Sequence, residues 1–89
     1  MKVTVLYFAS LREQLGTGLE ELELPAGVLT LGGLRAHLGA RGGAWQAALA
    51  GGRNVRMAVN QDMVPGGQVE GAPIKSGDEI AFFPPVTGG

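Results

Sequence analysis

The amino-acid sequence predicts one small domain of the α+β class. Side chains alternate with a period of two, as in half-buried strands, at residues 2–8 and 55–60 of the 89-residue chain. Between these runs, leucines recur at helical spacing. No repeat, linker or low-complexity segment divides the chain, and its length suits a single small core.

The first expected strand covers residues 2–8, a run rich in β-branched and aromatic residues. Its alternate residues would point to opposite faces, with one set in the core. The core set is Val3, Val5 and Tyr7, and the other set is Thr4, Leu6 and Phe8. A short helix over residues 11–15 is expected next, because Ser10 and Glu13 have capping-box spacing and Gly16 stands where a C-terminal helix glycine belongs.

A second strand, antiparallel to the first, is expected over residues 19–24, where leucines alternate with glutamates until Pro25 ends the run. Thr30 can cap a second helix, whose leucines at positions 31, 34 and 38 have helical spacing. Gly32 and Gly33 each weaken this helix by roughly 1 kcal/mol relative to alanine. Its stability must therefore come from packing.

The remaining sequence predicts one more helical piece and three strands. The helical piece covers residues 44–50, where Trp45 begins an apolar stripe. Residues 55–60 alternate as a third strand, and a short fourth strand is expected at residues 63–64. The last strand covers residues 80–83, and Pro84 ends it because proline cannot donate to a sheet ladder.

This order of elements resembles that of a ubiquitin-like β-grasp domain. The resemblance implies a mixed sheet in which the first and last strands are adjacent and parallel, with the helices on one face. It divides the chain into a β-grasp domain over residues 1–84 and a flexible C-terminal Gly-Gly tail over residues 85–89. The pairing of the strands rests on the resemblance, because periodicity alone gives the elements and not their partners.

Composition excludes several classes of function. The net charge is -1 and the seven basic residues are scattered, so no dense cationic stripe indicates a nucleic-acid site. The absence of cysteine removes disulfides, thiolate catalysis and thiolate metal sites. The N-terminal run is too short and too alternating for a signal peptide, and no apolar run approaches a membrane span. We therefore expect a cytoplasmic protein that binds neither nucleic acid nor a membrane.

A search for catalytic or metal-binding motifs is largely negative. His37 is the only histidine, and a metal site normally needs several converging ligands. Asp78 and Glu79 would point to opposite faces of a strand, and Asp78 is expected to end the turn at Ser76 and Gly77. The stretch PGGQVEG at residues 65–71 lacks the flanking elements and the lysine of a phosphate loop. We expect this chain to bind no metal or cofactor itself.

The last residues are the remaining candidate site. Pro84 and Pro85 would hold an extended root, while Gly88 and Gly89 could pass through a channel too narrow for any side chain. A terminal carboxylate can attack the α-phosphate of ATP supplied by a partner enzyme, and the acyl adenylate is then open to a sulfur nucleophile. The alternative interpretation is a frayed terminus, because 16 of the 89 residues are glycine.

Three stretches together resemble the small sulfur-carrier subunit of molybdopterin synthase, the MoaD family, over essentially the whole chain. They are KVTVLYFASLREQLG near the start, NQD after the third strand and GDEIAFFPPVTGG at the end. The resemblance implies that a ubiquitin-activating-like enzyme uses ATP to adenylate Gly89, which becomes a thiocarboxylate. Inserted into the large subunit, with Gly88 giving clearance, it would donate sulfur to the pterin precursor. The loop at residues 65–72 is longer and richer in glycine than the family pattern, so its contacts stay open.

The resemblance also implies a docking surface on a chain that is not catalytic alone, within a heterotetramer of two small and two large subunits. Strand alternation would bring Phe8 and Phe83 together near the root of the tail. Met63 would be a third member of this surface or would cap the core edge. The tail residues expected in the same interface are Pro84, Pro85, Val86 and Thr87. Two alternatives remain: a β-grasp sulfur carrier for thiamine or tRNA thiolation, and a ubiquitin-like modifier.

Overall fold

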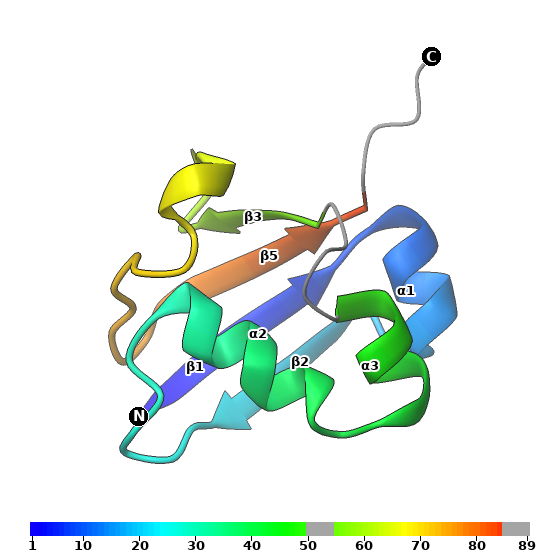
Figure 1. The fold of residues 1–89 in the computed structure, drawn as a ribbon, viewed down its shortest axis with the longest axis horizontal. Helices are drawn as coiled ribbons and strands as arrows, with labels where there is room; N and C mark the ends of the chain where they lie inside the picture. Colours follow the sequence, from blue (N-terminus) through cyan, green and yellow to red (C-terminus); the bar gives the residue numbers. More distant parts are fainter. Residues whose placement is uncertain (50–54, 85–89) are drawn as a thin grey trace.

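A five-stranded mixed sheet forms the centre of the computed structural model, which describes residues 1–49 and 55–84 (Figure 1). The strands are β1 (Lys2–Tyr7), β2 (Leu19–Glu23), β3 (Arg56–Val59), β4 (Asp62–Val64) and β5 (Glu79–Phe83). The helices are α1 (Ala9–Leu15), α2 (Leu31–Gly39) and α3 (Gly43–Leu49), with a 3-10 turn, η1, at Gly66–Gln68. The predicted number, type and order of helices and strands are confirmed.

The strands follow the order β2-β1-β5-β3-β4. The first and last strands, β1 and β5, are adjacent and parallel, and every other neighbouring pair is antiparallel. The predicted mixed sheet with parallel first and last strands is therefore confirmed. Because β1 and β5 run in the same direction, their C-terminal ends lie side by side at the same end of the sheet, where the chain leaves β5 at Phe83.

The core lies between the sheet and the helices that cover one face of it (Figure 1). The strand residues Val3, Val5 and Tyr7 are almost completely buried, as the alternation in β1 predicted. From α2, the three leucines at helical spacing are all inaccessible to solvent. Burial of these side chains supplies the packing energy that a helix with two consecutive glycines needs.

The helix boundaries confirm one capping prediction and correct another. Thr30 caps α2, and its hydroxyl oxygen accepts a hydrogen bond of 3.0 Å from the backbone N–H of Gly33. The predicted capping box of Ser10 and Glu13 is wrong, because α1 begins at Ala9 and Ser10 already lies inside the helix. The earlier start arises because Ala9, with φ of 52°, turns the chain directly from the end of β1 into the helix.

The loop between β4 and β5 packs closely on α2. Glu70 lies over Gly32, where a Cβ atom would come within 2.6 Å of both the side chain and the backbone of Glu70. Val69 is buried in the same core as the leucines of α2. The glycine in the first turn of α2 thus permits a close approach of this loop.

Within residues 1–49 and 55–84, no helix is long and apolar enough to cross a membrane.

A buried carboxylate ties the β3–β4 turn to the start of β5. Asp78 is 4% exposed, and its oxygens accept hydrogen bonds from the Lys75 backbone N–H at 2.9 Å and the Asn60 side-chain amide at 3.0 Å. Burial raises the pKa of Asp78, but these hydrogen bonds and the Lys75 charge outweigh it, so the pKa lies below its ordinary value. The prediction that Asp78 ends the turn at Ser76 and Gly77 is confirmed, because its backbone N–H donates to the carbonyl oxygen of Lys75 at 3.1 Å.

Replacing Asp78 by Asn should lower the unfolding free energy at pH 7 by about 1.5 to 3 kcal/mol, because charge-assisted hydrogen bonds are lost. The pKa of Asp78 is lower in the folded state than in the unfolded state. The charged carboxylate therefore stabilises the fold fully above the unfolded pKa, near 3.9, and this stabilisation is lost as pH falls through the folded pKa. Urea unfolding at pH 7 and pH 2 measures the difference in unfolding free energy between the unaltered chain and Asp78→Asn. The control is Asp62→Asn, because Asp62 is an exposed aspartate on β4. An equal difference at both pH values would contradict this role.

Candidate functional site

The candidate site begins where β1 and β5 end side by side. Tyr7 and Phe82 are register partners, and the backbone N–H of Phe8 donates to the carbonyl oxygen of Phe82 at 3.1 Å. This bond extends the parallel ladder by one residue and holds Phe8 beside the end of β5. Residue Pro84 then follows the last strand, as predicted. The predicted site residues Pro85, Val86, Thr87, Gly88 and Gly89 lie outside the described residues.

Two aromatic side chains stack on the outer face of the sheet at this point. The rings of Phe8 and Phe83 lie 4.8 Å apart between centroids and are inclined by 6°. Phe8 is 40% exposed and Phe83 is half-buried, so the pair presents apolar surface to solvent. The prediction that these two residues meet near the root of the tail is confirmed. Their role in binding a partner stays a prediction.

A second aromatic pair supports the first from the core side. Tyr7 and Phe82 stack with ring centroids 5.7 Å apart, and both side chains are almost completely buried. Trp45 of α3 packs edge-on against Tyr7 at 5.3 Å. Because Tyr7 precedes Phe8 and Phe82 precedes Phe83, alternation puts one pair on each face of the same two strands. The exposed pair therefore sits on a well-packed base.

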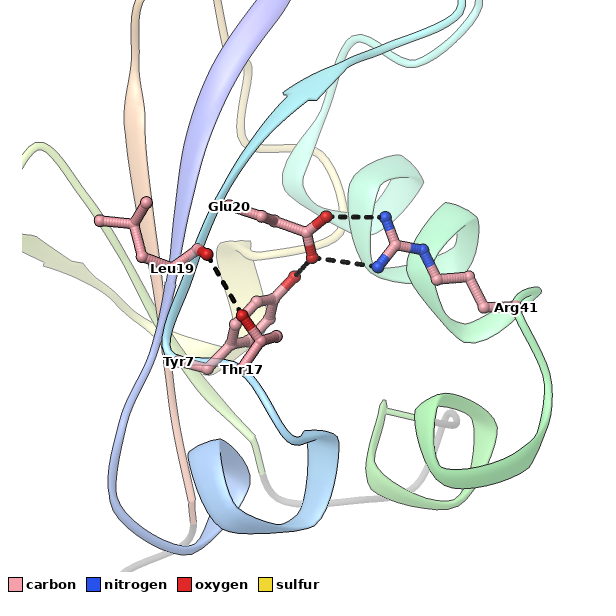
Figure 2. Close-up of polar contacts among 5 residues, drawn as sticks. All are labelled: Tyr7, Thr17, Leu19, Glu20 and Arg41. Carbon is pink, nitrogen blue, oxygen red and sulfur yellow. Dashed lines mark hydrogen bonds and ion pairs between the residues drawn. The ribbon is translucent and has the colours of Figure 1, made fainter.

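Polar contacts hold Tyr7, one member of the inner pair, in place (Figure 2). The Tyr7 hydroxyl donates to Glu20 at 2.8 Å, and Arg41 donates to both oxygens of the same carboxylate at 2.9 and 3.0 Å. The Arg41 guanidinium also lies 4.4 Å from the ring centroid of Trp45. Arg41 and then Tyr7 hold the pKa of Glu20 below its usual range, although burial opposes them. Burial first, and then Glu20, raises the pKa of Tyr7.

The other predicted residues are distributed as follows. Met63 is 52% exposed and pairs with Ala58, so it lies on the outer face but at the far edge of the sheet from Phe8. Asp78 is buried at the opposite end of β5 from the stack. Within the part of the chain that the structure describes, no three His, Asp or Glu residues are grouped to hold a metal ion. The exposed stack of Phe8 and Phe83 therefore remains the candidate site among the described residues.

Comparison with known proteins identifies the family of this chain. A model of the ThiS family matches residues 5–89. The chain belongs to the ThiS family. This ThiS-family chain is 42% identical over 87 residues to the molybdopterin synthase sulfur carrier subunit of Haemophilus influenzae, and the match covers 98% of the chain and 99% of that relative.

Two solved structures agree with the fold of this ThiS-family chain. The putative molybdopterin converting factor subunit 1 from Pyrococcus furiosus has a TM-score of 0.74 and 32% identity, covering 97% of this chain and 99% of that one. A chain in the complex of molybdopterin-converting factor subunits 1 and 2 from Helicobacter pylori has a TM-score of 0.67 and 25% identity, with complete coverage of both. The expected ubiquitin-like β-grasp fold is confirmed.

Proposed function

We propose that this chain is the sulfur carrier of molybdenum cofactor biosynthesis and the small subunit of molybdopterin synthase. Identity of 42% over nearly the full length of a curated sulfur carrier subunit supports the assignment. The single structural observation that carries it is the exposed stack of Phe8 and Phe83 at the point where the chain leaves β5. An exposed apolar surface at this position suits a carrier whose terminal residues are bound by other proteins.

The proposed chemistry takes place at the Gly89 carboxylate. The carboxylate attacks the α-phosphate of ATP, so that pyrophosphate leaves and an acyl adenylate forms. A sulfur nucleophile then displaces AMP and leaves a thiocarboxylate. On transfer to the pterin precursor, sulfur leaves the acyl carbon and water restores the carboxylate. A ubiquitin-activating-like adenylyltransferase binds the ATP, and this chain holds no cofactor of its own.

The proposed partner for sulfur transfer is the large subunit of molybdopterin synthase, in a cytoplasmic heterotetramer of two small and two large subunits. A complex of the two converting-factor subunits from H. pylori supports the pairing, because its structure contains a chain with this fold at 25% identity. The large subunit would supply the groups that bind the pterin and move protons. Its tail-binding pocket would be basic, because the thiocarboxylate and a phosphorylated pterin are both anions.

An omission experiment tests this division of labour. Thiocarboxylated chain, large subunit and pterin precursor are combined with each component left out in turn, and dithiolene formation is followed. Product is expected only when all three are present, because the chain supplies sulfur and the large subunit supplies the acid-base groups. The matched control is the same chain with an ordinary Gly89 carboxylate, which should give none. Product from chain and precursor alone would place the active site in this chain and contradict the proposal.

A further inference from the structure

One register row on the outer face of the sheet is entirely apolar. Because Cα partners in neighbouring strands share a face, the pairings of the four strand ladders place one residue from each strand in this row. In sheet order the row is Leu19, Leu6, Ala81, Ala58 and Met63. We call it the apolar band. It crosses five strands, which at about 4.8 Å per strand spacing is roughly 19 Å.

The band is most exposed at its two ends. Leu19 is 58% exposed and Met63 is 52% exposed, whereas Ala81 and Ala58, which lie between them, are buried. The stack of Phe8 and Phe83 stands in the next register row on the tail side, so its exposed surface continues into that of the band. The exposed apolar side chains of the outer face therefore extend beyond the Phe8–Phe83 stack to Leu19 and Met63.

Charges border this surface asymmetrically. On the side away from the tail, the next row contains Glu21, Thr4 and Glu79, which places two carboxylates on the outer face. On the tail side, Arg56 is the register partner of Phe83 and is exposed. A surface that covers the band would therefore meet negative charge along the border away from the tail and positive charge beside the stack. This pattern favours a partner surface that is basic where it faces Glu21 and Glu79 and acidic where it faces Arg56.

We propose that the large subunit covers the full apolar band, that Leu19 is its anchor at the β2 edge, and that basic residues of the large subunit face Glu21 and Glu79. The inference rests on the proposed function and deepens it, because on the sheet the interface extends beyond Phe8, Met63 and Phe83, the sheet residues that the sequence indicated. An aliphatic side chain more than half exposed on an edge strand gains free energy when a partner buries it. The neighbouring glutamates fix the register of that contact by charge complementarity.

The test compares three variants in calorimetric titrations with the large subunit. Leu19→Thr, which keeps a strand-forming residue, should weaken binding about five- to tenfold. Glu21→Lys should also weaken binding, and its effect should shrink as salt is raised. The matched control is Leu29→Thr: Leu29 is 56% exposed in the loop before α2, outside the sheet, and its replacement should leave the dissociation constant unchanged. Melting temperatures of all three should stay near that of the unaltered chain.

The outcomes separate this inference from the proposed function. If the unaltered chain binds and Phe83→Ala weakens binding while Leu19→Thr and Glu21→Lys do not, the extended band is wrong and the proposed function stands. If the unaltered chain forms no complex with the large subunit, both fail. Sedimentation of the chain alone tests self-association. A dimer that Leu19→Thr disrupts, with binding to the large subunit unchanged, would assign the band to a second copy and overturn the inference.

Discussion

Deleting Gly89 is expected to abolish activation by the adenylyltransferase while the unfolding free energy of the domain stays the same. Under the proposed function, the carboxylate that attacks ATP must reach the α-phosphate through a channel matched to the full tail. Shortening the tail by one residue withdraws the carboxylate by up to about 3.5 Å. A reacting atom displaced even by about 1 Å can cost a hundredfold in rate, so a displacement of this size should remove the reaction.

Exchange of labelled pyrophosphate into ATP, with the activating enzyme and either form of the chain, measures this effect. The matched control is Gly67→Ala, because a Cβ atom at Gly67 meets no other atom within 4 Å, so this variant changes a glycine away from the tail without a clash. Its exchange rate should equal that of the unaltered chain. Exchange at the normal rate by the chain without Gly89 would mean that the terminal carboxylate is not the activated group.

Local sequence patterns predicted most of the elements because each depends on residues close together in the chain. The Thr30 cap needs only a hydroxyl three residues before the Gly33 N–H, and the burial of β1 follows from its alternation. The capping box at Ser10 failed because the ladder bond from Phe8 to Phe82 holds the chain beside β5 up to Phe8, and Ala9, with φ of 52°, then turns it directly into α1. Tertiary contacts there decide where the helix starts.

The sequence could not predict which side chains on different elements lie next to each other, because this depends on how the strands pair and how the helices pack. Leu19 and Leu6 belong to different strands, and nothing in either segment says that they share a row with Ala81. The same holds for Glu20 and Arg41, which meet at 2.9 Å although 21 residues separate them. Phe8 and Phe83 could be paired in advance only because the β-grasp resemblance implied parallel neighbouring strands. The apolar band required the pairings of all five strands.

Adjacent residues Phe82 and Phe83 provide the sharpest test of which face of β5 meets the partner. Phe82 is completely buried, belongs to the core cluster and stacks on Tyr7. Phe83 is half-buried on the opposite face and stacks on Phe8, which is 40% exposed. Both residues are phenylalanines on the same strand, so each serves as the matched control for the other.

Phe82→Ala should therefore lower the unfolding free energy by about 3 to 5 kcal/mol, because it leaves a cavity in the core, while the folded fraction binds the large subunit nearly normally. Phe83→Ala should do the reverse: binding weakens by about 1 to 3 kcal/mol, as for an aromatic anchor at an interface, and the melting temperature changes little. Urea unfolding and calorimetric titration of both variants give the four values needed. A large stability loss for Phe83→Ala with unchanged affinity would show that Phe83 serves the core, and the partner would then have to approach through another surface.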